Sequence, residues 1–146
     1  MEELIQNLYN PDNKIAYSAL KELEKLSKDN NDVYKYFDTF VEMLDSENSY
    51  IRTRGIILIS NNAKWDCENK LNKIIDKFLL HIEDDKPITA RQCIKSLENI
   101  IKHKEELIPI INKRLLEINY LKYDDSMQSL IFKDVEKILE LVEKEV

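Results

Sequence analysis

Apolar residues recur at intervals of three and four along almost the whole chain, a spacing that places them on one face of an α-helix. One apolar stripe covers residues 33–44, a second covers 71–82 and a third covers 107–118. Further helical stripes lie between these, over residues 15–26, 51–59, 88–101 and 130–142, and residues 1–9 predict a short first helix. The pattern therefore predicts an all-α protein of about eight helices.

Polar turns separate the predicted helices at regular distances. NPDNK (10–14), DSENS (45–49), EDDKP (83–87) and YDDS (123–126) each place Asp, Asn or Ser ahead of a helix, where such side chains cap free backbone N–H groups. The helices that follow begin at about Ile15, Ile51, Ile88 and Leu130, at spacings of 36, 37 and 42 residues. A helix pair recurring at this period is typical of an α-solenoid. We expect one domain, 1–146, made of four units with approximate bounds 1–28, 29–62, 63–103 and 104–146.

The composition supports this prediction and narrows the classes of protein. One glycine and three prolines are too few for the tight turns of an all-β fold. Hydrophobic residues at 43% and charged residues at 34% suit a globular helical protein. No apolar run reaches the length of a membrane span, and the acidic start MEELIQNLYN lacks the basic-then-apolar order of a signal peptide. We therefore expect a cytoplasmic protein with no membrane contact.

The second unit resembles a known repeat family. HEAT repeats carry a turn with Asp, a β-branched residue followed by Arg, a small residue and then Leu, and a similar pattern is made by Asp45, Ile51, Arg52, Gly55 and Ile59. The stretches IRTRG, NAKWD, KPITARQCIKSL and DSMQSLIFKD also resemble small uncharacterised bacterial HEAT-like proteins, some labelled as related to the Suf iron–sulfur scaffold SufBD. The resemblance implies a right-handed, armadillo-like α-solenoid of about four helix pairs. It also implies that Arg52 pairs with turn aspartates along the stack.

The stretch YIRTRGIILIS (50–60) contains the only glycine and two of the four arginines of the chain. At 100° per residue, Gly55 lies at the centre of the apolar face, with Arg52 and Arg54 on opposite flanks. Glycine inside a helix costs about 1 kcal/mol relative to alanine. We therefore expect Gly55 to allow close approach of the paired helix, and we expect the two arginines to have separate roles.

A row of basic residues makes the predicted binding surface. Arg91 lies 37 residues after Arg54, in the equivalent phase of the next unit, and Lys95 lies one turn further on. Lys133 takes the matching place in the fourth unit. Residues 51–103 carry a net charge of +3, between −6 for 1–50 and −3 for 104–146. We name Arg54, Arg91, Lys95 and Lys133 the predicted ridge; it either holds an acidic helix, a phosphate or an acidic loop, or is an ordinary solvated face.

Other candidate residues have structural alternatives. Trp65, the only tryptophan, either anchors a partner or covers the joint between two units. Cys67 and Cys93 lack metal-ligand spacing, so we expect two reduced, mostly buried thiols. His81 and the acidic run 83–85 suit helix dipoles, so no metal is expected. Without a catalytic triad or a glycine-rich phosphate loop, neither a catalytic residue nor a cofactor is predicted.

These features favour a non-catalytic scaffold or adaptor that binds an acidic surface or helix of a protein partner, as a monomer or weak homo-oligomer. The enzymatic alternative is a HEAT-like nucleic-acid-binding protein or alkylpurine DNA glycosylase, for which Trp65, Asp66 and Arg54 are the only matches. The net charge of −6 argues against nucleic acid. A third hypothesis is an accessory subunit or chaperone of a larger assembly, because a solenoid exposes apolar surface at uncapped ends.

Overall fold

The prediction of an all-α protein is confirmed. The computed structural model describes residues 1–145; Val146, the last residue of the predicted fourth unit, lies outside the described residues. The described chain contains no strand, and its α-helices are α1 (Glu2–Asn7), α2 (Asn13–Asp29), α3 (Phe37–Met43), α4 (Ser49–Asn61), α5 (Lys70–Leu79), α6 (Pro87–His103), α7 (Ile108–Leu116) and α8 (Asp125–Glu145). Short 3₁₀ helices connect them: η1 (Tyr34–Tyr36), η2 (Ala63–Trp65), η3 (Leu80–Glu83), η4 (Glu105–Leu107) and η5 (Tyr120–Lys122).

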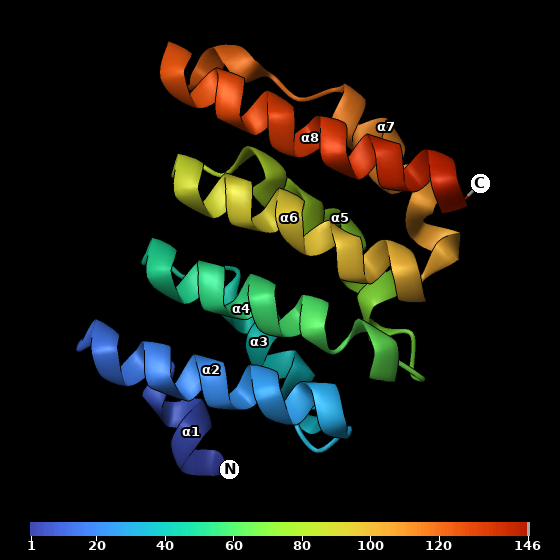
Figure 1. The fold of residues 1–146 in the computed structure, drawn as a ribbon. Helices are drawn as coiled ribbons and strands as arrows, with labels where there is room; N and C mark the ends of the chain where they lie inside the picture. The colour runs from blue at the N-terminus through green and yellow to red at the C-terminus, as the bar shows by residue number, and fades with distance from the viewer. Residues whose placement is uncertain (146) are drawn as a thin grey trace.

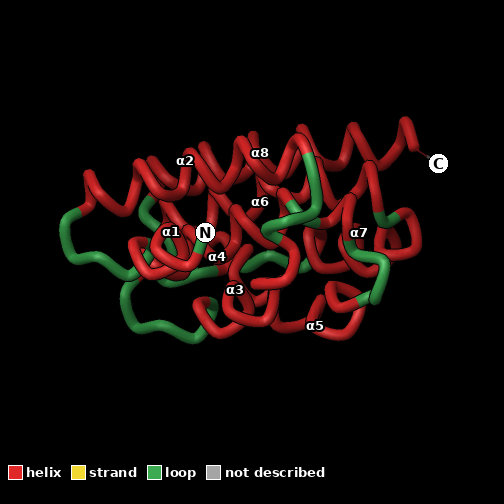
Figure 2. The backbone as a smooth tube through the Cα atoms, turned by 90° about the horizontal axis from the view of Figure 1, so that it is seen from below, coloured by secondary structure: helices red, strands yellow, loops and turns green. Residues whose placement is uncertain are grey.

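The helices form two layers. The long helices α2, α4, α6 and α8 lie side by side and run in the same direction, with their N-terminal ends on the left of Figure 1, and the short helices lie behind them. The view from below in Figure 2 separates α2 and α8 on one side from α3 and α5 on the other. α1 packs on α2, α3 on α4 and α7 on α8, whereas α5 joins α6 mainly through η3. Among residues 1–145, no helix combines the length and apolar character that crossing a membrane requires.

The predicted side-chain caps of α2 and α4 are confirmed. Asp12 Oδ1 accepts from the Lys14 N–H at the start of α2, and Asn48 Oδ1 accepts from the Tyr50 N–H at the start of α4, both at 2.9 Å. α6 begins differently, because Pro87 occupies its first turn and Lys86, at the N-cap, supplies no side-chain hydrogen bond. Pro87 has no N–H, so one of the donors that a cap would otherwise satisfy is missing at the start of α6.

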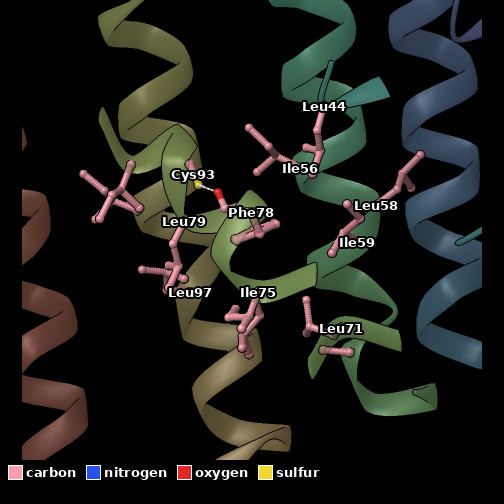
Figure 3. Close-up of a cluster of buried hydrophobic side chains, with 14 of the residues drawn as sticks. Leu44, Ile56, Leu58, Ile59, Leu71, Ile75, Phe78, Leu79, Cys93 and Leu97 are labelled. Carbon is pink, nitrogen blue, oxygen red and sulfur yellow. Dashed lines mark hydrogen bonds between the residues drawn. The ribbon is translucent and has the colours of Figure 1, made fainter. Parts of the chain in front are cut away.

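The core lies between the two layers. Phe37, Phe40 and Phe78, predicted as core from their spacing, are fully buried. Figure 3 shows Ile56 and Ile59 of α4 packed in the same cluster as Phe78 and Leu79, with Leu97 of α6 beside them. The Cys93 thiol is also buried here and lies 3.7 Å from the Phe78 carbonyl oxygen. Burial raises the pKa of Cys93, because the thiolate would lose its hydration.

Some residues assigned to the core by periodicity are exposed. Ile15 and Ile88, near the starts of α2 and α6, are open to solvent. Leu130, the predicted start of the last helix, is also exposed, but α8 begins earlier, at Asp125. The long helices have 13–21 residues and the short ones 6–10, so the second layer does not cover the first along its whole length. The expectation of two mostly buried thiols is wrong for Cys67, which lies exposed between η2 and α5. Neither cysteine forms a disulfide.

α3 and α4 approach each other closely at Gly55. A Cβ atom at this position would lie 2.8 Å from the Phe40 carbonyl oxygen and 2.9 Å from Met43 Cβ, both on α3. Both distances are shorter than side-chain carbons tolerate, and the nearer atom belongs to the backbone. The absent side chain therefore lets α3 pack directly on the backbone of α4.

Replacing Gly55 with alanine should lower the free energy of unfolding, although alanine is the better helix former. The gain in helix propensity is about 1 kcal/mol, whereas overpacking a buried site costs about 1–3 kcal/mol. Since the nearest atom is the Phe40 backbone oxygen, α3 must shift as a whole to relieve the contact. We expect a net loss of about 1 kcal/mol for Gly55→Ala and a larger loss for Gly55→Leu, measured by urea unfolding followed by circular dichroism.

Ser18→Ala provides the control for this experiment, because Ser18 lies on the exposed face of α2. It should leave the stability unchanged or raise it slightly, as alanine has the higher helix propensity. A rise of about 1 kcal/mol in the stability of Gly55→Ala, the full gain in helix propensity, would show that the added methyl group meets no atoms of α3 at this point.

Candidate binding groove

A groove of about 790 Å³ crosses the N-terminal parts of α2, α4 and α6. These three helix ends lie next to one another on the left of Figure 1. Tyr17, Tyr50 and Ile88 present apolar surface in its lining and are 59%, 60% and 68% exposed. The volume falls within the range of about 300–1,000 Å³ typical of ligand sites. We name this hollow the α2–α4–α6 groove.

The charge of the groove is positive. Lys14, Arg54 and Lys86 line it, and its lining contains no acidic side chain. The parallel α2, α4 and α6 also direct the positive ends of their dipoles toward this edge. The groove therefore combines apolar surface with a potential that favours an anion, although the whole chain has a net charge of −6.

Arg54 is the buried cation of this groove, with only 7% of its surface exposed. Its guanidinium donates to the Leu8 carbonyl oxygen at 2.8 Å and to Asn13 Oδ1 at 3.2 Å, and lies 5.9 Å from the Tyr50 ring centre. Burial lowers the pKa of the Arg54 guanidinium, but arginine stays charged at neutral pH. Among residues 1–145, Arg54 forms no ion pair, whereas the other three arginines pair with carboxylates.

The floor of the groove is held by a pair of threonines. The Thr53 hydroxyl donates to the Ser49 carbonyl oxygen at 2.8 Å, within α4. The Thr89 hydroxyl lies 2.9 Å from Thr53 Oγ1 and is then the donor to it. This contact links the N-terminal parts of α4 and α6, so the two helix ends are held at a set separation.

The residues of the predicted ridge are not gathered into one site. Arg54 lies in the groove, but Arg91, Lys95 and Lys133 are not in its lining. Arg91 Nε donates to Asp134 Oδ2 at 2.7 Å, and this hydrogen bond raises the pKa of Arg91. Lys95 and Lys133 are exposed and form no ion pair with other residues of the described chain. Arg91, which the sequence pattern aligns with Arg54, is thus already neutralised by Asp134 of α8.

Arg52 joins the turn before α4 to the turn before α6. Its Nε and Nη2 donate to the two Asp84 carboxylate oxygens at 2.9 and 2.7 Å, and its Nη1 donates to the Ser46 and Glu47 carbonyl oxygens at 3.1 Å. The aspartate of the HEAT-like pattern, Asp45, is exposed and pairs with Lys77 instead. The partner of Arg52 is therefore the buried aspartate of the following turn.

The Asp84 carboxylate has hydrogen-bond partners on three residues. Besides Arg52, it accepts from the Lys86 N–H at 2.9 Å, and Oδ2 lies 2.8 Å from His81 Nδ1. Burial alone would raise the pKa of Asp84, but the hydrogen bonds from His81, Arg52 and Lys86 outweigh it and hold this pKa well below its ordinary value. Residues 1–145 contain no group of three or more His, Cys, Asp and Glu side chains arranged to hold a metal ion.

Trp65 and Asp66 lie in a structural joint away from the groove. Trp65 Nε1 donates to the Ser27 carbonyl oxygen at 2.7 Å, near the C-terminal end of α2. The buried Asp66 carboxylate accepts from the Tyr34 hydroxyl, from the Lys70 and Leu71 N–H groups at 2.9 Å, and pairs with Lys104 at 3.1 Å. Because these contacts saturate Asp66, it has no free oxygen for the role that the glycosylase alternative would give it.

Sequence reasoning missed most of the groove. Lys14, Tyr50 and Lys86 follow one another at intervals of 36 residues, and so do Tyr17, Thr53 and Thr89. Equivalent positions of adjacent parallel helices lie in line across a layer, so these two series mark one surface. The same period aligns the apolar and arginine positions, but the sequence pattern assigns the starts of these helices to the core or to caps, so Lys14 and Lys86 do not stand out in it.

Asp84→Asn should destabilise the protein by about 3 kcal/mol at neutral pH, because it leaves the partly buried Arg52 without its carboxylate. The folded-state pKa of Asp84 lies below the ordinary 3.8. The wild-type pair therefore stabilises the protein at neutral pH, and this stabilisation is lost as the pH falls below about 4. Chemical unfolding at a series of pH values should show a shallower acid decline in the variant.

Asp85→Asn changes the neighbouring exposed residue and provides the control. Its stability at neutral pH and its loss of stability at acid pH should match those of the wild type, since exposed ion pairs contribute little. An Asp84→Asn variant with wild-type stability and an unchanged pH profile would contradict the structural role given to the Arg52–Asp84 pair.

Comparison with known protein families, curated proteins and solved structures finds no match to this chain.

Proposed function

We propose that this protein is a non-catalytic binding module that holds an acidic, partly apolar segment of a protein partner in the α2–α4–α6 groove. The observation that carries this proposal is the lining itself. Exposed apolar side chains, Tyr17, Tyr50 and Ile88, stand beside three basic groups and no acidic one. Aromatic residues and arginine are the side chains most enriched where proteins bind one another.

We further propose that the frame is a HEAT-like α-solenoid of about four helix pairs. The parallel long helices of one layer, backed by short helices, support this view (Figure 1). So do the ion pairs Arg52–Asp84 and Arg91–Asp134, which connect α4 to the turn before α6 and α6 to α8. In such a frame each unit presents equivalent positions to one surface, and an elongated partner contacts several units at once.

A protein segment fits this groove better than a nucleic acid does. Nucleic-acid binders neutralise many phosphates, and their binding surfaces are strongly basic. Here the groove offers three basic groups in a chain with a net charge of −6. Trp65, the aromatic residue that the glycosylase alternative would use, donates Nε1 to the Ser27 carbonyl oxygen and is not in the lining of the groove.

Peptide pools test the proposal directly. Adjacent packed helices lie about 8–10 Å apart, so the groove spans roughly 16–20 Å from α2 to α6, the length of about six extended residues. An acidic pool of randomised peptides of about eight residues, drawn from Asp, Glu, Leu, Phe and Gly, should bind in a fluorescence anisotropy assay. A basic pool, with Lys and Arg in place of Asp and Glu, should not bind.

Two charge reversals of equal size locate the site. Lys14→Glu/Lys86→Glu changes the groove rim and should weaken binding of the acidic pool by at least about tenfold, because like charges then face each other. Lys95→Glu/Lys133→Glu changes the same number of exposed lysines on the predicted ridge and should have little effect. Loss of binding in the second variant alone would move the site to the ridge, and equal binding of both pools would reject the charge complementarity.

A further inference from the structure

We infer that Arg54 is the anchor of the groove, which takes a carboxylate of the bound peptide as a two-point ion pair. This inference rests on the proposed function and names the chemistry of the partner: a segment with an Asp or Glu side chain flanked by apolar residues. Lys14 and Lys86, at the exposed rim, then attract the segment, and Arg54 selects for the carboxylate.

The hydrogen bonds of Arg54 leave donors for such a ligand. A guanidinium has five N–H donors, of which one on Nη1 goes to Leu8 and one on Nη2 goes to Asn13. No residue among 1–145 accepts from Nε–H or from the second N–H of either terminal nitrogen. Arg54 Nε, which has no partner among the described residues, keeps some exposure to solvent. Arg54 also belongs to the lining of the groove, so we place the ligand of its Nε–H there.

The chain itself shows how its arginines bind carboxylates. Arg52 and Arg91 each direct Nε and Nη2 at the two oxygens of one aspartate. Arg54 is the most buried of these three arginines and the one without a carboxylate among the described residues. A buried charge is costly unless it is paired, so a peptide carboxylate placed on Nε and Nη2 supplies the same pairing that Asp84 and Asp134 supply.

A carboxylate suits the groove better than a phosphate. Arg54 contributes one buried positive charge, which a carboxylate balances with one negative charge. A phosphate group carries a charge of about −1.5 to −2 and three acceptor oxygens, so part of its charge would remain without a partner. The other two basic groups, on Lys14 and Lys86, are exposed to water. Tyr50 and Ile88, on α4 and α6, offer apolar contact to the residues that flank the carboxylate.

The test compares an acidic peptide with its amide copy. The tightest member of the acidic pool is resynthesised, together with a copy in which every Asp and Glu is replaced by Asn and Gln. Affinities are measured in about 1 M NaCl, where the Debye length is about 3 Å and exposed lysines are screened. The wild type should still prefer the acidic peptide by at least about tenfold. Arg54→Gln should bind both peptides alike, and Lys95→Gln/Lys133→Gln, at exposed residues outside the groove lining, should keep the wild-type preference.

A nuclear magnetic resonance measurement tests the anchor in the wild-type protein, so that its result does not depend on whether Arg54→Gln folds. In the wild type, the Nε–H signals of the four arginines are resolved by nuclear magnetic resonance and assigned with single Arg→Lys variants. The Arg54 signal should shift when the acidic peptide is added and not when the amide copy is added. The Arg52 and Arg91 signals should stay in place, because their Nε–H groups already donate to Asp84 and Asp134.

The outcomes separate the two proposals. No binding of the acidic pool to the wild type at physiological salt would reject the binding module and the anchor together. Suppose instead that the acidic pool binds. If Arg54→Gln then keeps the preference for the acidic peptide, or if the Arg54 Nε–H signal does not shift, the anchor is rejected and the binding module stands. A phosphoserine copy that binds more tightly than the acidic peptide would overturn the carboxylate assignment.

Discussion

The ion pair between Arg52 and Asp84 is the interaction on which the arrangement of the groove depends. Arg52 donates to both oxygens of Asp84 and to the backbone of the turn before α4, while Asp84 accepts from the N–H of Lys86 at the start of α6. One buried contact therefore sets the first turns of α4 and α6 side by side. The Thr53–Thr89 contact and the apolar surface of Tyr50 and Ile88 follow from that placement.

Arginine serves two opposite purposes in this small protein. Where a carboxylate lies opposite, as for Arg52 and Arg91, the charge is neutralised and the pair holds neighbouring helices together. Arg54 is equally part of the packed structure, through Leu8 and Asn13, but these neutral acceptors leave its charge uncompensated. A buried cation beside apolar, reachable surface is costly for the free protein and favourable for an anionic partner. Stability and binding thus use the same side chain with different partners.

Local patterns predicted the helices because a helix is governed by spacing and capping within a few residues. The apolar stripes, the caps at Asp12 and Asn48 and the packing role of Gly55 all follow from such short-range signals. Periodicity names the face of a helix that is buried, but not how far along its length a neighbour covers it. Ile15 and Ile88 were therefore assigned to the core, although the short helices leave them exposed.

The amino-acid order alone was enough to establish the all-α class, the positions of the turns and the period at which similar residues recur. The tertiary structure decided which charges find a partner. Arg52 meets Asp84 across 32 residues, Arg91 meets Asp134 across 43, and Arg54 meets Leu8 across 46. Since the free energy of a charged group depends on burial and on the partner within a few ångströms, the same residue type becomes a structural pair in one place and a binding candidate in another.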